Sequence, residues 1–263
     1  MRKLFLVLLA GLWCAGTAQA QNKRVGYELE VWPELQAEYA LLNGGYLFLS
    51  AGGQRSTNSD MENRGGFYRK HLRAGYETFL TEQWSVGGTA RYTHTAGMGD
   101  FTPEILLRHR SNIGALTFGQ RLSAEYRFAD TPDQTRGVTR LRLDLERQFP
   151  VGSTVVLRPR LAYELGAYLR LQRDEEAQPK ERVIDFTTLR AEVGIRFSDR
   201  LDITPWFGYL ASYQFVLPQT DSDGNPIPGG RRNFVTPTVG LETRITLFSG
   251  SLPANRNQLP TQH

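Results

Sequence analysis

The sequence has a single cysteine, Cys14, and it lies within a stretch that has the layout of an export signal. Met1-Arg2-Lys3 is basic, Leu4 to Leu12 is apolar, and Ala18-Gln19-Ala20 has the small-x-small form of a cleavage site. We therefore expect residues 1–20 to be a cleaved signal peptide. The mature chain would then have no cysteine, which excludes a disulfide, a thiol nucleophile and a thiolate metal site.

Long apolar runs and helical periodicity are also missing. Beyond residue 20 no apolar run approaches the ~20 residues of a membrane helix, and no window of about 11 residues keeps a convincing helical period. Lysine is scarce as well, because 27 of the 31 basic residues are arginine. Two explanations of this bias stay open: a high-GC genome, or a need for planar, bidentate partners to carboxylates.

What the sequence does have is alternation of apolar and polar residues. In LRLDLERQF, residues 141–149, leucine occupies every second place and Arg142, Asp144 and Glu146 fill the others. A β-strand sends alternate side chains to opposite faces, so this segment has one apolar face and one charged face. Eleven such segments fill nearly the whole chain after the signal: 27–41, 46–55, 68–77, from 84, from about 101, 116–128, 141–149, 157–165, 189–197, 203–215 and 234–248.

The lengths of these segments and of their connections indicate the architecture. The segments run ~9–16 residues, against about 5–6 for a typical globular strand, and a tilted strand of about 9–11 residues crosses a bilayer. Short connections alternate with long ones, as at the two rims of an outer-membrane barrel. The short ones are 81–83, 111–112, 150–153 and 198–200; the long ones are 56–66, 96–100, 129–136, 171–182 and 218–231.

We therefore expect an all-β fold: one transmembrane, antiparallel, up-and-down β-barrel of about 10–12 strands with a charged lumen. It would span residues 21–248 and be followed by a polar tail, residues 249–263. The count of eleven segments conflicts with the even strand number of bacterial single-chain barrels. Either one hairpin is misread, or the first segment is not an ordinary wall strand and its glutamates face the arginines from within.

The charged face is expected to point inward. Fourteen arginines and thirteen carboxylates fall on the polar faces, and an enclosed face favours arginine over lysine for bidentate pairing. Tyrosine and phenylalanine near strand ends suit an interfacial girdle on the apolar face. We expect oppositely charged side chains to stand opposite each other on neighbouring strands and to close the lumen. The predicted lumen charge ladder comprises Glu28, Glu30, Glu34, Glu38, Arg69, His71, Arg73, Arg121, Glu125, Arg127, Arg140, Arg142, Asp144, Glu146, Arg158, Arg160, Glu164, Arg190, Glu192, Arg196, Glu242 and Arg244.

Three stretches carry a resemblance to a known family. VWPELQAEYALLNGGYLFLSAGGQR near the start, LDITPWFGYLASYQF before the end and the final VTPTVGLETRITLF resemble a bacterial outer-membrane β-barrel family filed as domain of unknown function 2490. The likeness covers about Val25 to Phe248 and implies an outer-membrane barrel without assigned catalytic residues. The chain departs from the usual ending of such barrels, since Phe248 is followed by fifteen polar-tail residues instead of closing the chain.

No constellation of residues points to catalysis, a cofactor or a metal. His71 lies on the charged face between Arg69 and Arg73, but no serine motif accompanies it as a hydrolase would require. No two histidines share ligand spacing. The stretch 220–230, TDSDGNPIPGG, is rich in oxygen ligands but lacks the spacing and closing glutamate of an EF-hand.

The expected location is the outer membrane of a Gram-negative bacterium. The expected partners are outer-membrane lipid and lipopolysaccharide, the barrel-assembly machinery and small solutes. Export and the pairing of arginine with carboxylates argue against nucleic acid. About eight strands give a filled barrel and about sixteen an open channel, so this barrel is intermediate. A narrow or gated small-solute channel is favoured; the alternatives are a closed structural or loop-presenting barrel and a lipid-modifying enzyme.

Overall fold

The computed structural model describes most of the chain between residues 23 and 249. The described ranges are 23–58, 66–130, 135–152, 154–169, 183–216, 218–220, 224, 226–227 and 229–249. The predicted signal peptide, the expected loop 171–182 and the tail beyond Ser249 lie outside these residues. Every regular element in the described part is a β-strand. No helix there has the length and hydropathy to cross a membrane.

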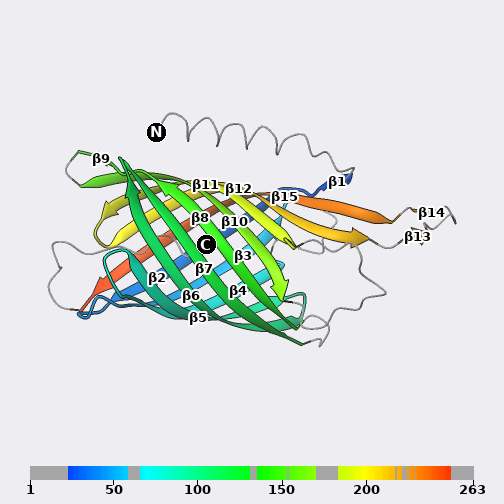
Figure 1. Cartoon of the computed structure of the whole chain (residues 1–263), viewed down its shortest axis with the longest axis horizontal. Helices are drawn as coiled ribbons and strands as arrows, with labels where there is room; N and C mark the ends of the chain where they lie inside the picture. The colour runs from blue at the N-terminus through cyan, green and yellow to red at the C-terminus, as the bar shows by residue number, and fades with distance from the viewer. Residues whose placement is uncertain are drawn as a thin grey trace.

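Within the described residues, eleven strands form the wall of a closed barrel (Figure 1). They are β2 (Glu30–Ala40), β3 (Tyr46–Ser56), β4 (Arg69–Phe79), β5 (Trp84–Thr95), β6 (Met98–Ile113), β7 (Leu116–Ala129), β8 (Arg136–Glu146), β10 (Val155–Leu169), β11 (Phe186–Ser198), β12 (Leu201–Val216) and β15 (Gly230–Phe248). Two short strands extend the sheet: β1 (Lys23–Gly26) beside β15, and β9 (Phe149–Val151) beside β10. The expected count of eleven segments is confirmed.

The barrel closes by a parallel pairing of its first and last wall strands. β15 pairs with β2 from Thr238 opposite Glu30 to Phe248 opposite Ala40, and both strands run in the same direction. The expectation of an antiparallel barrel throughout is therefore wrong at this seam. The two explanations for the odd strand number are also wrong, because all eleven segments are wall strands, the first included. An odd number of strands closes without conflict when the closing pair is parallel.

The two rims of the barrel differ in their connections. Short turns gather at the left end in Figure 1, where β15 ends, and the rim at the right end carries the small hairpin of β13 (Gln219–Thr220) and β14 (Pro226–Ile227). We call these the turn-side rim and the loop-side rim. The hairpin lies within the stretch 218–231, for which we expected a plain loop.

Two of the expected connections are placed wrongly. The stretch 96–100 is not a long loop, because β5 ends at Thr95 and β6 begins at Met98. Ala96 and Gly97 form a tight turn with φ angles of 48° and 85°, the left-handed pair that suits a two-residue hairpin. The expected turn at 111–112 lies inside β6, and the chain reverses at Gly114, whose φ is 61°. A single glycine marks each of these turns, and the polar residues beside it misled the prediction.

The alternation predicted from the sequence is confirmed. In β8 the residues Leu141 and Leu145 are 38% and 42% exposed, whereas Arg142 and Asp144 are only 6% and 8% exposed. Large apolar side chains are exposed in the same way on the outside of every wall strand. The only apolar core cluster in the described part is small, with Ala40 and Tyr46 packed against Phe79 and Phe248 at the turn-side rim. The interior is therefore mainly polar.

Candidate functional site

The candidate site is the charged lumen, which has two parts. One part is a cavity near the loop-side rim, and the other is a set of ion pairs nearer the turn-side rim. Twelve residues of the predicted ladder line the cavity: Glu34, Arg69, His71, Arg73, Arg121, Glu125, Arg127, Arg140, Arg142, Glu164, Arg190 and Glu242. Seven belong to the ion pairs: Glu38, Glu146, Arg158, Arg160, Glu192, Arg196 and Arg244. Asp144, on β8, is buried on the same side of the barrel.

The last two residues of the predicted ladder lie elsewhere. Glu30, at the start of β2, accepts hydrogen bonds from the Trp32 indole at 2.7 Å and from the Tyr68 hydroxyl at 3.0 Å. Glu28 lies between β1 and β2, where the register against β15 shifts by one residue, and it is exposed. Its place in the ladder is therefore wrong, because the simple alternation assumed an unbroken strand.

We define the turn-side cluster as six arginines and six carboxylates that lie in the wall strands on the turn side of the cavity. They are Arg108, Arg110, Arg158, Arg160, Arg196, Arg244, Glu38, Glu77, Asp144, Glu146, Glu192 and Asp202. The charges of this set cancel. Most of its side chains are buried, and those of Glu38, Glu77 and Asp202 are at most 1% exposed.

The ion pairs of the turn-side cluster connect strands that are not neighbours as well as strands that are. Asp202 on β12 accepts a hydrogen bond from Arg158 on β10 at 2.8 Å and forms an ion pair with Arg244 on β15 at 3.2 Å. Arg244 also reaches Glu38 on β2 at 3.4 Å, across the parallel seam. This chain of contacts fastens four wall strands to one another from inside the barrel.

A second chain of contacts runs from β6 to β15. Arg110 lies 3.4 Å from Glu146 on β8, and Arg160 on β10 lies 3.9 Å from the other oxygen of that carboxylate. Arg160 also pairs with Glu192 on β11. Glu192 is 2.6 Å from Arg190, which in turn pairs with Glu242 on β15. Most of the paired groups are buried, whereas the side chain of Arg110 is 21% exposed.

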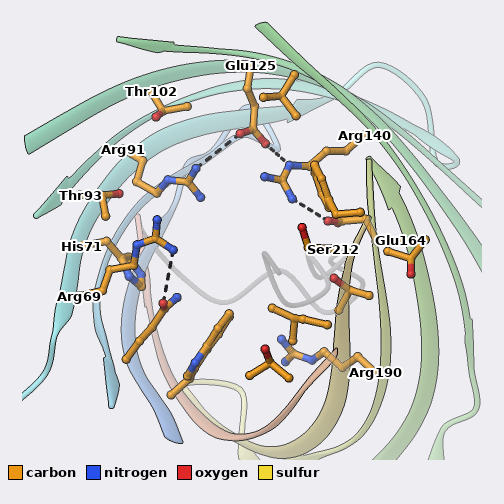
Figure 2. A pocket seen from close by; sticks show the side chains of 18 of the residues that line it. Arg69, His71, Arg91, Thr93, Thr102, Glu125, Arg140, Glu164, Arg190 and Ser212 are labelled. Atoms are coloured by element: carbon orange, nitrogen blue, oxygen red, sulfur yellow. Dashed lines mark hydrogen bonds and ion pairs between the residues drawn. The ribbon is translucent and has the colours of Figure 1, made fainter. Parts of the chain in front are cut away.

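The loop-side cavity has a volume of about 520 Å³. Figure 2 shows its side chains converging on a central space from all around the wall, with Arg91 and Arg140 on either side of Glu125. Nine arginines line it against six carboxylates. The arginines are Arg69, Arg73, Arg91, Arg121, Arg127, Arg136, Arg140, Arg142 and Arg190; the carboxylates are Glu34, Asp100, Glu104, Glu125, Glu164 and Glu242. Unlike the turn-side cluster, the described lining of the cavity therefore carries an excess of positive charge.

Some of the cavity arginines are held firmly by carboxylates. Arg127 binds Asp100 through two parallel hydrogen bonds, each of 2.7 Å. Arg140 donates to Glu125 at 2.6 Å and to Glu164 at 2.9 Å, and Figure 2 shows it between these two carboxylates. Such charge-assisted and bidentate bonds fix the direction of a guanidinium group. These arginines have fixed orientations at the cavity wall.

Other positions place like charges opposite each other. Arg73 on β4 faces Arg91 on β5, and Arg121 on β7 faces Arg142 on β8. The expected alternation of opposite charges on neighbouring strands occurs on the other side of the barrel, for example where Arg160 faces Glu146 and Glu192. On the β4–β8 side the expectation is wrong. Directly opposed like charges destabilise a sheet unless another group neutralises them.

Aromatic side chains form a second part of the cavity wall. Trp32 and Trp206 meet edge to face, with ring centroids 5.8 Å apart. The guanidinium of Arg190 lies over the Trp206 ring at 4.2 Å, and that of Arg136 lies over the Tyr168 ring at 3.9 Å. Stacking of this kind orients the guanidinium groups and leaves their N–H groups in the plane parallel to the ring, where they can still donate hydrogen bonds.

Tyr68 lies just before β4, near the loop-side rim. Its hydroxyl is within 3.3 Å of the Gln54 amide oxygen as well as donating to Glu30. Burial and the neighbouring Glu30 carboxylate both raise the pKa of Tyr68 above its usual value, because each disfavours the phenolate. The hydroxyl therefore stays protonated and remains a donor at this rim.

The histidine and metal predictions can be placed in the structure. His71 lines the cavity and lies 3.2 Å from Glu34 on β2. His109 packs against Trp84, with ring centroids 4.4 Å apart. Within the described part of the chain, no group of three histidine, cysteine, aspartate or glutamate side chains could hold a metal ion.

Sequence reasoning missed several lining residues of the cavity. Arg136 and Asp100 lie at strand starts that we placed too late, and Trp32 and Trp206 were not assigned to the lumen. Strand parity could have found both tryptophans, because each occupies the same alternation as the charged residues around it. Only tyrosine and phenylalanine were assigned to a face, the outer girdle, and the alternation of the two tryptophans was not used.

Comparison with protein-family models, with curated proteins and with solved structures finds no match to this chain.

Proposed function

We propose that this chain is an outer-membrane β-barrel of a Gram-negative bacterium whose lumen is closed at rest and passes at most small solutes. The observation that carries the proposal is that the barrel is apolar outside and charged inside, the reverse of a soluble protein. Apolar side chains are exposed all around the outside, and charged side chains are buried inside. Monomeric soluble proteins rarely expose contiguous apolar patches larger than a few hundred Å², whereas a barrel in lipid requires such a surface.

Other features support the same location. The wall strands are 11 to 19 residues long, enough for tilted strands to cross a bilayer. The stretches that resemble the outer-membrane family form β2, β3, β12 and β15, which are the strands on either side of the seam. Lipid and lipopolysaccharide would contact the outside of the barrel, and the barrel-assembly machinery would insert it.

The turn-side cluster supports closure. A conducting pore needs a continuous path for water, and the paired side chains on the turn side are buried from solvent. Their charges cancel, so this segment would also give little ion selectivity, which in channels comes from rings of one sign. Passage of a solute would require part of the cluster to open. We therefore favour a narrow, gated channel over a general porin.

Fractionation and conductance test this proposal in two steps. Cells that express the full chain are expected to yield it in the outer membrane, with a mobility on gels that changes on heating. Reconstitution in a planar bilayer is then expected to give small, brief openings. Recovery as a soluble periplasmic monomer would refute the membrane location, and large, steady conductance that scales with salt would refute the closed lumen.

A closed structural or loop-presenting barrel is the second candidate, and the burial of the turn-side cluster also favours it. Complete silence over long bilayer recordings, from protein that is folded and inserted, would select it over the channel. The lipid-modifying enzyme is tested separately by incubating the reconstituted protein with phospholipid and following the release or transfer of acyl chains.

A further inference from the structure

We propose that the loop-side cavity binds a small organic anion, in which a phosphate or carboxylate group contacts Arg73 and Arg91 and an apolar or aromatic part lies near the tryptophans. This ligand site goes beyond the proposed channel function. It requires only the folded barrel, so it holds whether the lumen conducts or stays closed.

Arg73 is a buried arginine of the cavity wall that lacks a close acceptor. Its side chain lines the cavity and the residue is only 6% exposed, yet within the described residues it forms no ion pair and no side-chain hydrogen bond. Glu104 interacts with it electrostatically, but from beyond ion-pair distance. A buried guanidinium without a hydrogen-bond acceptor carries a large desolvation cost. An oxyanion in the cavity would supply the missing acceptor.

Arg91 adds a second donor at the same place. It faces Arg73 directly across the β4–β5 pair, and its one carboxylate contact, with Glu125, is 3.5 Å long. That carboxylate is shared with Arg140, which binds it more closely at 2.6 Å. Glu104 acts electrostatically on both guanidinium groups but forms no ion pair with either. Two opposed guanidinium groups without a closely bound carboxylate of their own match the oxygens of one phosphate or carboxylate.

The excess of positive charge extends over the whole cavity. Its described lining has nine arginines against six carboxylates, whereas the turn-side cluster has six of each. The turn-side arginines are therefore matched in number by carboxylates of the same cluster, whereas the cavity arginines are matched only in part. A structural role in closing the wall would predict balanced charge in both parts.

The aromatic residues indicate that the ligand is organic and larger than an inorganic ion. Trp32, Trp206 and Phe186 lie in the cavity lining together with the arginines. Pockets for small organic ligands typically have volumes of about 300–1,000 Å³ and combine apolar walls with a few placed polar groups. The volume of about 520 Å³ lies within that range.

Calorimetric titration of the folded, full-length protein in detergent tests this site with three probes. Phenyl phosphate combines an oxyanion with a ring, inorganic phosphate lacks the ring, and benzyl alcohol lacks the charge. We expect saturable binding of phenyl phosphate, weaker binding of inorganic phosphate and no saturable binding of benzyl alcohol. Arg73→Gln is expected to weaken phenyl phosphate binding about tenfold or more, as for loss of a hydrogen bond to a charged group.

Variants of the cavity arginines and of a control arginine outside the cavity test whether phenyl phosphate binds at this site. Arg55→Gln removes an exposed, outward-facing arginine of β3 and is expected to bind as the wild type does. Arg73→Lys keeps the charge, and its affinity for phenyl phosphate is expected to lie between those of the wild type and Arg73→Gln. Arg91→Gln replaces Arg73→Gln if the latter does not fold, and a tenfold loss is expected there too. Absence of saturable phenyl phosphate binding to folded wild type, equal binding of benzyl alcohol, or full binding by a folded Arg73→Gln or Arg91→Gln variant would each overturn the proposal.

Discussion

Arg244 in the last wall strand pairs with Glu38 in the first, at 3.4 Å between Nη1 and Oε1, although 206 positions separate them in the sequence. Both side chains are buried, at 4% and 0% exposure, on the lumen side of the parallel seam. This contact, together with the pair between Arg244 and Asp202, fixes β15 from both sides.

Removal of the seam carboxylate is expected to destabilise the barrel. Glu38→Ala removes the pair of Arg244 across the seam and leaves its pair with Asp202 in place. We expect a loss of about 3 kcal/mol, the lower end of the range for breaking a buried ion pair. Reversible urea titration in lipid measures it. Glu28→Ala, at an exposed position just before β2, is the control and is expected to stay within about 0.5 kcal/mol of the wild type. Equal stability of the two variants would contradict the role of the seam pair.

The outward face is expected to tolerate charge only near the rims. Leu143→Arg, in the middle of β8 on the apolar face, should cost ~2–4 kcal/mol in lipid. Leu42→Arg introduces the same residue in the 41–45 turn, where Leu42 is 82% exposed, and should cost about 0–1 kcal/mol. Urea titration in lipid vesicles compares the two. A Leu143→Arg variant as stable as the wild type would show that this face does not contact lipid.

Two neighbouring lumen arginines are expected to differ in their importance. Arg160→Leu removes one cation from each of two buried carboxylates, Glu192 and Glu146. Arg190 still contacts Glu192 and Arg110 still contacts Glu146, so we expect a cost of about 3 kcal/mol, the lower end of the range for breaking a buried ion pair. Arg142→Leu should cost less than half as much, since its nearest carboxylate oxygen, on Glu192, is 4.0 Å away. Asp144, which follows on the same face of β8, forms no ion pair with Arg142. Equal losses in urea titration would contradict this ranking.

Disruption of the turn-side cluster is expected to open the lumen. Asp202 neutralises Arg158 at 2.8 Å, Arg244 at 3.2 Å and Arg196 at 3.7 Å. Asp202→Asn would leave these three cations to repel one another, and we expect more frequent and longer openings in planar-bilayer recordings. Asp199→Asn alters an exposed turn residue nearby and should behave as the wild type does. Unchanged conductance of a folded Asp202→Asn variant would argue that this cluster does not form the barrier.

The wall of the barrel was readable from the sequence, because inside and outside impose a strict period of two. Residues 141–146 alternate without exception, and each of the eleven segments corresponds to a strand. The direction of the closing pair was not readable, because a strand has the same pattern in a parallel and in an antiparallel pairing. Only the spatial arrangement of β2 and β15 decides it.

The lumen was readable only in outline. Alternation predicted that Arg73 and Arg91 point inward, but not that they face each other, since a shift of two residues in register keeps both inside. Partners such as Arg158 and Asp202 skip a strand, so pairing by neighbouring strands could not find them. The separation into a balanced cluster and an arginine-rich cavity emerges only when strand tilt and register are known.

The parallel seam also bears on the order in which the barrel folds. Every other wall pairing joins strands that follow each other along the wall, through a turn or a loop, and can form as soon as both strands exist. The β2–β15 pairing must wait for the whole chain, and contacts of such long sequence separation form slowly. We expect closure to be the last and slowest step, and pulse-labelled hydrogen exchange during refolding should find the seam amides of β2 and β15 protected after those of β6 and β7. Until then β2 and β15 each have a free edge, and a second unfinished barrel could pair with either.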